Sequence, residues 1–203
     1  MSKIKIGVLA VQGDVTENFL ATMASMSELG IDGSVIQVKT VEQISSGLII
    51  PGGESTVIGQ MSLVNGAIKK IKEKIESGMP VFGICAGMVF LSKNSQDRVV
   101  GDVDQPLLDI LDVKIERNSF GRQKDSFEAN ISMEPIGISS FNGVFIRAPS
   151  VSETGSDVEI LAKFNEKIVA VKQGNVIATA FHPELTRDIS LHKSFVKLVD
   201  NQS

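Results

Sequence analysis

The stretch MPVFGICAGMVFL, residues 79–91, joins an apolar strand pattern to an apolar helix pattern through the only cysteine of the chain. We expect 81–84 to form a short buried strand and 86–91 to form a helix packed against the same core. Cys85 lies at the junction, with a glycine two residues away on either side. Because glycine leaves room for a sharp strand-to-helix turn, the segment predicts an elbow like that of GxSxG motifs, with sulfur in place of oxygen.

An elbow would place the Cys85 sulfur at the first turn of a helix. The unpaired N–H groups and the positive end of the helix dipole favour a thiolate there, and the thiolate is the nucleophilic form of cysteine. The alternative is that Cys85 is only a small buried apolar side chain, as lone cysteines often are. Gly83 and Gly87 favour the elbow, but this segment alone leaves both interpretations open.

Length and composition bound the class of protein. The 203 residues are 42% hydrophobic and 22% charged, which is typical of one soluble domain spanning 1–203. A net charge of −4 and the absence of Trp and Tyr argue against binding to nucleic acid or to an anionic membrane. A single cysteine cannot form an internal disulfide, no apolar run is long enough to span a membrane, and the run at 4–11 is too short for a signal peptide. We therefore expect a cytoplasmic location.

Strands alternate with helices through the first half of the chain. Strands are expected at 4–11, 34–38 and 47–50, and helices from Asp14 or Thr16 to Leu29 and over 64–75. This alternation predicts an α/β fold with a doubly wound parallel sheet and helices on both faces. Ligands bind such sheets at the carboxyl ends of the strands. Three segments should therefore share one rim, namely Gln12-Gly13, Gly52-Gly53 and Cys85.

The second half changes to short strand patterns. The polar block 94–106 is interpreted as a surface loop, and 189–199 as a final amphipathic helix. Several of the short strands should form antiparallel hairpins that extend the sheet. The predicted strands are 113–117, 126–132, 143–147, 158–163, 167–172 and 175–181, with turns at 142–143, 154–156 and 174–175.

A cysteine nucleophile needs a base, and the chain has two histidines. His192 sits among polar residues of the terminal helix, so we expect it to be solvated. His182 directly follows a strand and precedes Pro183, which favours an extended backbone. In an extended chain residues i and i+2 point to the same side, so Glu184 should lie beside the imidazole. Cys85, His182 and Glu184 then form a candidate nucleophile, base and acid triad, unless HPE is only a strand end with a solvated glutamate.

Acyl chemistry also needs donors for a developing oxyanion. The turn Pro51-Gly52-Gly53-Glu54-Ser55 can direct the N–H of Gly53 toward a pocket, and the N–H of Ala86 is the natural second donor. The alternative is a tight turn into a helix capped by Ser55. A phosphate loop is disfavoured because a Walker lysine is missing, and no spacing of Cys, His or carboxylates indicates a metal site. We expect neither a metal nor a cofactor.

These motifs resemble those of a known family. GICAG, PGGEST and the late HPE are similar to the triad-type (class I) glutamine amidotransferases. The resemblance narrows to the glutaminase subunits of pyridoxal 5′-phosphate synthase and runs from the first strand to the terminal helix. The narrower motifs are ERNSFGRQ at 116–123, DSFEA at 125–129, GVFIRAP at 143–149 and AFHPELT at 180–186. The resemblance implies a three-layer doubly wound, flavodoxin-like mixed sheet.

The resemblance also implies an activity. Cys85 would attack the side-chain amide of L-glutamine, form a γ-glutamyl thioester and release ammonia, while His182 moves the protons. A guanidinium suits the α-carboxylate of glutamine, and a glutamate suits its ammonium, although the arginines could instead be surface ion-pair members. The positions that match the glutamine-binding residues of the family are Gly53, Glu54, Ser55, Arg117, Ile146 and Arg147.

The implied partner is a separate pyridoxal 5′-phosphate synthase subunit, a (β/α)8 barrel in a hetero-oligomer. The chain departs from the family pattern QGxxxEH at Asn18, so contacts near that partner could differ. Two alternatives remain. One is a γ-glutamyl hydrolase or another cysteine hydrolase on the same fold, and the other is a non-catalytic glutamine-sensing or scaffolding subunit. The presence of all three triad residues argues against the second.

Overall fold

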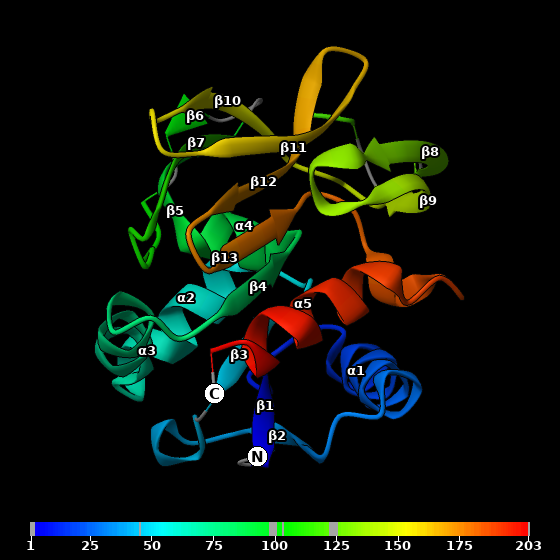
Figure 1. The fold of residues 1–203 in the computed structure, drawn as a ribbon. Helices are drawn as coiled ribbons and strands as arrows, with labels where there is room; N and C mark the ends of the chain where they lie inside the picture. The colour runs from blue at the N-terminus through cyan, green and yellow to red at the C-terminus, as the bar shows by residue number, and fades with distance from the viewer. Residues whose placement is uncertain (1–2, 45, 98–100, 103, 122–125, 203) are drawn as a thin grey trace.

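A computed structural model describes residues 3–44, 46–97, 101–102, 104–121 and 126–202. Within these residues, eleven strands form one mixed sheet in the order β2-β1-β3-β4-β13-β12-β10-β7-β5-β6, with β11 paired to β12 (Figure 1). The first five strands in this order are parallel to one another. They are β1 Ile4–Leu9, β2 Gly33–Val38, β3 Gly47–Ile50, β4 Val81–Ile84 and β13 Val176–Thr179.

The other strands extend the sheet mainly by antiparallel pairing. They are β5 Ser92–Asp97, β6 Gly101–Asp102, β7 Leu111–Arg117, β10 Ser150–Thr154, β11 Glu159–Phe164 and β12 Lys167–Gln173. β8 Phe127–Met133 and β9 Ile138–Phe145 form a separate antiparallel pair. The expected mixed sheet, parallel first and antiparallel later, is confirmed.

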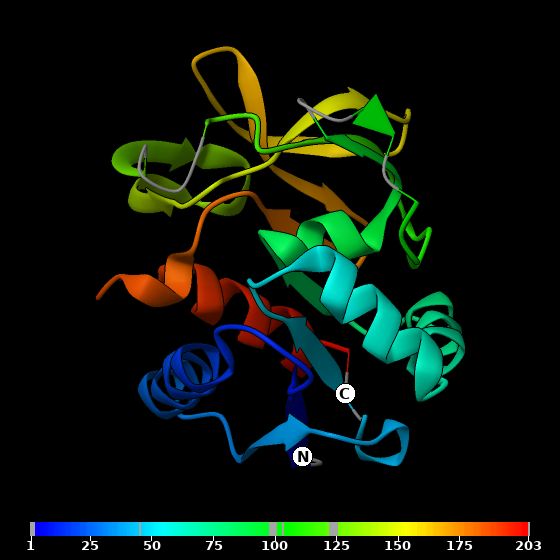
Figure 2. The ribbon, with the colours of Figure 1, turned by 180° about the vertical axis from the view of Figure 1, so that it is seen from behind.

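Helices cover both faces of the parallel half (Figures 1 and 2). α1 Val15–Leu29 and α5 Ser190–Asp200 pack together on one face. α2 Ser55–Val64, α3 Ala67–Glu76 and α4 Ala86–Leu91 gather on the other. Short 3-10 turns are η1 Val41–Gln43, η3 Glu134–Ile136 and η4 Pro183–Leu185. The fully buried parallel strands β3, β4 and β13 read as continuous apolar runs because helices shield them from water on both sides.

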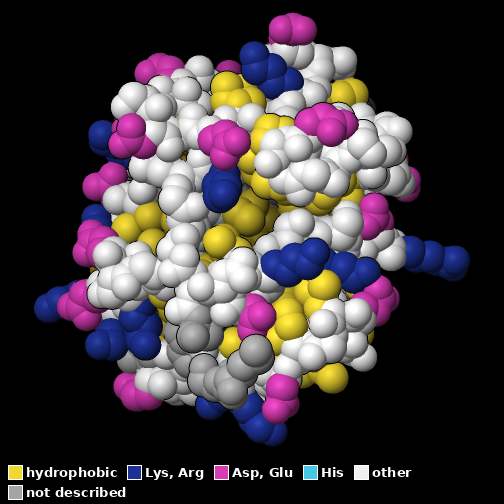
Figure 3. Space-filling view, viewed as in Figure 1, with side chains coloured by type: hydrophobic (Ala, Val, Ile, Leu, Met, Phe, Trp, Pro, Cys, Tyr) yellow, Lys and Arg dark blue, Asp and Glu magenta, His cyan; other side chains and the backbone are white. Residues whose placement is uncertain are grey.

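Several predicted boundaries are confirmed. β3 and β4 have the predicted limits, and α4 begins directly after Cys85. α1 ends at Leu29 because Gly30 takes the left-handed conformation, with a φ of 66°. Among the described residues, no helix has both the length and the apolar content needed to cross a membrane. Lysine, arginine and acidic side chains are scattered over the face seen in Figure 3.

The predicted helix at 64–75 is confirmed over 67–75 as part of α3, but its predicted start is wrong. α2 ends at Val64, and α3 begins only at Ala67. Between them Gly66 has a φ of 73°, a left-handed conformation that ends a helix and that glycine adopts readily. The apolar stripe of α3 was recognised, whereas α2 was not, because Val64 and other apolar side chains of α2 are exposed and blur its periodicity.

Two predictions in the second half are also wrong. The block 94–106 is not simply a loop, because β5 pairs with β7 and β6 there; its residues 98–100 and 103 lie outside the described part. The strand can be polar because the hydrogen bonds that pair it with β7 and β6 are formed by the backbone. Asn142-Gly143 is not a turn either, since β9 passes through it in register with β8. The chain reverses instead at η3 and Gly137, whose φ is 75°. β10 was not predicted.

The strand-to-helix elbow depends on two close approaches. A Cβ at Gly87 would overlap the carbonyl oxygen of Ile50, and one at Gly83 would overlap the side chain of Leu91. Cys85 itself has a φ of 49°, which is uncommon for a residue with a side chain. The glycines therefore supply space for α4 to pack on the sheet, and the cysteine carries the backbone strain.

The substitution Gly87→Ala should destabilise the protein strongly, by at least about 3 kcal/mol, because the obstructing atom is backbone and cannot swing away. The matched control is Gly174→Ala, where the φ is 55° but no atom lies within 4 Å of the added methyl. It should cost only about 1 kcal/mol from backbone strain. Urea unfolding of both variants measures the difference, and equal losses would contradict the steric account of the elbow.

Candidate active site

A cavity of about 310 Å³ lies at the carboxyl ends of the parallel strands. Gln12 follows β1, Gly53 follows β3, Cys85 follows β4 and His182 follows β13, and all four side chains or backbones line it. The expectation that these segments share one rim is confirmed. The antiparallel extension closes the other side of the cavity with Arg117 and the segment Ile146–Pro149.

His182 is held against a carboxylate. Its Nδ1 lies 2.8 Å from Oε1 of Glu184, and both residues are buried, at 4% and 7% exposed. The backbone at His182 is extended, as Pro183 predicted, and its N–H donates to the carbonyl of Val144. The prediction that the extended backbone continues through Glu184 is wrong, because Pro183–Leu185 form the 3-10 turn η4, and it is this turn that places Glu184 beside the imidazole. Cys85 and His182 line the same cavity. The structure therefore brings together the three residues that the sequence singled out.

A second carboxylate touches the same nitrogen. Asp14 Oδ2 lies 3.3 Å from His182 Nδ1. The sequence offered Asp14 only as a helix cap, and its side chain makes no capping hydrogen bond. Its position directly after Gln12-Gly13, on the rim shared with Cys85, was the signal that could have identified it.

The electrostatics of the site favour a protonated imidazole. Burial alone would lower the pKa of His182, but hydrogen bonding with Asp14, Cys85 and Glu184 outweighs burial and raises this pKa to about 12. Burial raises the pKa of Glu184, against the opposing effect of its hydrogen bond with His182. These contacts therefore favour the protonated form of the ring over the neutral form.

Asp14, His182 and Glu184 offer three potential ligand atoms within 4.8 Å of one another. Both carboxylates point at the one ring nitrogen, and the shorter contact is a hydrogen bond. The contacts of both carboxylates with the His182 nitrogen account for the closeness of these three residues. The expectation that the protein holds no metal stays a prediction.

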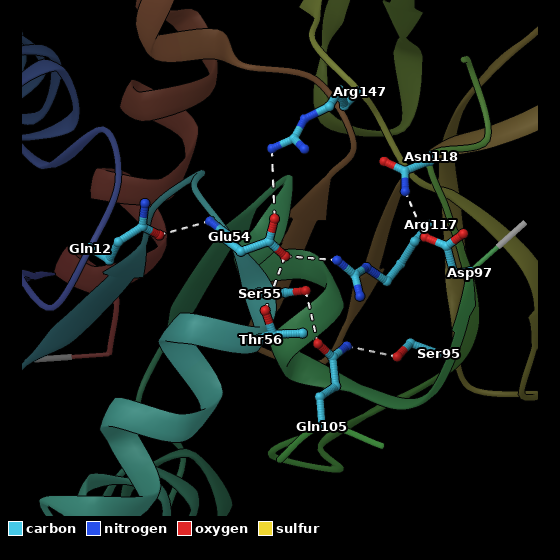
Figure 4. Close-up of polar contacts among 10 residues, drawn as sticks. All are labelled: Gln12, Glu54, Ser55, Thr56, Ser95, Asp97, Gln105, Arg117, Asn118 and Arg147. Atoms are coloured by element: carbon cyan, nitrogen blue, oxygen red, sulfur yellow. Dashed lines mark hydrogen bonds and ion pairs between the residues drawn. The ribbon is translucent and has the colours of Figure 1, made fainter. Parts of the chain in front are cut away.

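The PGGES turn is hydrogen-bonded to Gln12, in the loop that follows β1. The N–H of Glu54 donates to Oε1 of Gln12 over 2.7 Å (Figure 4). Gly53 has a φ of 155°, which L side chains rarely adopt, and a Cβ there would overlap the Gln12 amide. Gly53 and Ala86, the two predicted oxyanion donors, both line the cavity beside Cys85.

Two of the predicted glutamine-binding residues, Arg117 and Arg147, pair with the carboxylate of a third, Glu54. Arg117 Nη2 lies 2.7 Å from Oε1 of Glu54, and Arg147 Nη2 lies 3.7 Å from Oε2 (Figure 4). Ile146 lines the same cavity. Ser55 donates to Gln105, which in turn donates to Ser95. Both arginines therefore face the cavity and share an ion pair inside it.

Some side chains of the cavity were not predicted. Asn118 and Val89 also line it, together with Pro149 and Leu185. Asn118 directly follows Arg117 and donates to Asp97. Of the narrower motifs, residues 122–125 lie outside the described part of the chain.

His192 is not solvated, contrary to prediction. It is fully buried, its Nε2 lies 3.0 Å from Oδ1 of Asn18, and its ring packs edge-on against Phe82. Burial lowers its pKa to about 4, so the ring is neutral. The prediction failed because polar neighbours were weighed above helical spacing, which puts His192 on the buried face with Phe195 and Val196. Asn18, the departure from the family pattern, is thus a buried partner of His192.

The doubly wound α/β fold is that of the glutamine amidotransferases. A crystal structure titled as a glutamine amidotransferase superposes with a TM-score of 0.83 at 41% identity, covering 96% of this chain and 98% of that one. A model of the SNO glutamine amidotransferase family matches residues 8–201, and the chain belongs to that family.

Relatives named pyridoxal 5′-phosphate synthase subunit PdxT match almost the whole chain. The one from Nitrosopumilus maritimus (strain SCM1) is 64% identical over 197 residues, 96% of each chain. The one from Archaeoglobus fulgidus is 45% identical over 197 residues, 96% of this chain and 98% of the relative.

The buried His192 should make stability depend on pH. The unfolded chain takes up the proton near pH 6.5 and the folded chain only near pH 4. The contribution of His192 to stability is therefore complete above pH 6.5 and is lost as the pH falls toward 4, by up to about 3 kcal/mol. Urea unfolding of wild type and His192→Leu across this range measures it. The difference between the two should change with pH below 6.5 and stay constant above it, and a pH-independent difference would refute the assignment.

Proposed function

We propose that the chain is a glutaminase that hydrolyses L-glutamine to L-glutamate and ammonia and supplies the ammonia to the barrel subunit of a pyridoxal 5′-phosphate synthase. The observation that carries the proposal is the His182–Glu184 hydrogen bond of 2.8 Å in the cavity that Cys85 lines. Membership of a glutamine amidotransferase family and the names of the relatives support the substrate and the partner.

In the proposed first half-reaction, Cys85 attacks the side-chain amide carbon of glutamine as a thiolate. The carbonyl oxygen becomes an oxyanion, for which the N–H groups of Gly53 and Ala86 are the proposed donors. The C–N bond then breaks, His182 gives its proton to the leaving nitrogen, and ammonia departs. A γ-glutamyl thioester remains on Cys85.

In the proposed second half-reaction, the now neutral His182 takes a proton from water as the water attacks the thioester. A second oxyanion forms and collapses, the C–S bond breaks, and glutamate leaves. Cys85 returns to a thiolate and His182 to an imidazolium. Glu184 is proposed to hold the tautomer that keeps the other ring nitrogen toward the sulfur and to stabilise the positive ring.

The proposed substrate contacts reuse the ion pair inside the cavity. The α-carboxylate of glutamine would accept hydrogen bonds from Arg117 and Arg147, and Glu54 would then turn to the α-ammonium. Gly53, Ser55 and Ile146 complete the proposed binding set. A volume of about 310 Å³ is small for a ligand pocket, which favours free glutamine over the γ-glutamyl peptides of a γ-glutamyl hydrolase.

We further propose that residues 1–203 are one amidotransferase domain that works in the cytoplasm as part of a hetero-oligomer. A reducing compartment keeps the nucleophilic Cys85 from oxidation. A partner that receives ammonia directly keeps it from protonation in water, which would remove its nucleophilicity.

Replacing Cys85 with Ala should lower ammonia release from glutamine by at least about three orders of magnitude, since the residues of a triad act as a unit. The assay is run on the chain mixed with synthase, and thermal unfolding checks that the variant folds. Labelling of wild type by a glutamine-like electrophile should be confined to Cys85. Substantial activity in the variant would refute the nucleophile, and faster hydrolysis of γ-glutamyl peptides than of glutamine would favour the hydrolase alternative.

The isolated chain should be slow, and adding synthase should raise its turnover. The physical reason is that the Gly52-Gly53 turn can change conformation, and Gln12 already accepts the neighbouring N–H of Glu54. We expect the partner to set this turn in the form that offers a donor to the oxyanion. Ammonia release with and without synthase, at saturating glutamine, measures the effect. Turnover that does not change on adding synthase would rule the idea out.

A further inference from the structure

Asp14 is placed where a helix cap belongs but does not act as one. Its side chain makes no capping hydrogen bond to α1, and its Oδ2 points instead at His182 Nδ1 over 3.3 Å. About a third of the side chain is exposed, on the open side of the cavity. Glu184 approaches the same nitrogen from the buried side. The imidazole is therefore bracketed by two carboxylates.

The backbone of Asp14 is fixed from two directions. Its N–H donates to the carbonyl of Gly52 over 3.1 Å, which ties it to the turn after β3. Its own carbonyl accepts the side-chain amide of Asn18 over 2.9 Å, and Asn18 is bonded to the buried His192 of α5. The turn after β3 and, through Asn18, the helix α5 thus hold Asp14 beside His182.

Glycine at position 52 permits this close packing. A Cβ there would overlap His182 Cε1 and would stand 3.0 Å from Oδ2 of Asp14. Loop, imidazole and carboxylate are in contact only because that methyl group is missing.

Nδ1 carries a single hydrogen, so the two carboxylates cannot be equivalent. Glu184 at 2.8 Å is the main acceptor, and Asp14 at 3.3 Å is the weaker second one. A second anion adds Coulomb stabilisation when the ring is positive and opposes rotation of the ring away from Glu184. The charged or titratable groups that face His182 are Asp14, Glu184 and Cys85.

We propose that Asp14 is a positioning residue for His182 that, with Glu184, orients the ring and favours its imidazolium form beside Cys85. This inference rests on the proposed glutaminase function, because it assigns Asp14 a part in that reaction. Asp14 acts through His182 and leaves glutamine binding to the other residues of the cavity.

The test is Asp14→Asn in the chain assembled with synthase, which keeps the shape of the side chain and removes its charge. We expect kcat for glutamine to fall about tenfold, less than for loss of the main orienting carboxylate of a triad, with KM changed less than about twofold. The alkaline limb of the kcat profile should move to lower pH, because the imidazolium loses a stabilising anion. Asp14→Glu should recover part of the lost rate.

The matched control is Asp32→Asn, whose exposed carboxylate pairs with Lys3 at the opposite end of the sheet. It should behave as wild type. If Asp14→Asn equals this control, raises only KM, or lowers kcat without moving the alkaline limb, the inference is overturned. Urea unfolding of both variants shows whether a lower rate comes from lost folding, and a folded Asp14→Glu with no recovery also counts against it. Wild type that releases no ammonia would instead overturn the proposed function.

Discussion

The buried hydrogen bond between His182 and Glu184 constrains the rest of the site. The side chain of Glu184 has no exposed surface, and a carboxylate taken out of water is stable only when it is paired. Among the described residues, its Oε2 has no hydrogen-bond partner, so the imidazole bonded to Oε1 carries most of the compensation. The same bond sets the tautomer of the ring that faces Cys85. This one hydrogen bond thus offsets the cost of burying the carboxylate and orients the imidazole to act as a base.

The fold supplies this contact by ending four parallel strands at one rim. β4 delivers Cys85 through an elbow for which Gly83 and Gly87 leave the space, and β13 delivers His182 in an extended backbone that Pro183 enforces. The antiparallel extension has a different task. It brings Arg117 and Arg147, which are far from the parallel half in sequence, onto the carboxylate of Glu54. The parallel half therefore holds the reacting groups, and the extension holds the charges suited to a small zwitterion.

The parts that the sequence predicted well are those governed by local rules. The limits of β3 and β4 follow from apolar runs between turn residues, and the extended backbone of His182 follows from the restraint that proline places on the preceding residue. Most of the failures need tertiary information, although helical spacing with Phe195 and Val196 already indicates that His192 is buried. His192 is buried because α1 and the ring of Phe82 cover it, and its polar neighbours say nothing of that. β5 is a strand despite its polar sequence because its backbone pairs with that of β7. Asp14 contacts His182 only because two loops pack together.

The state of the two imidazoles tests the central claim most directly, and the chain has only these two histidines. Nitrogen NMR of the histidine-labelled protein, with His192→Leu to assign the signals, reads the protonation of each ring nitrogen. The account predicts that His182 keeps protons on both nitrogens between about pH 6 and 9, while His192 stays neutral with its proton on Nε2. A His182 signal that titrates near pH 6.5, as a free imidazole does, and that is unaffected by Glu184→Gln, would contradict it.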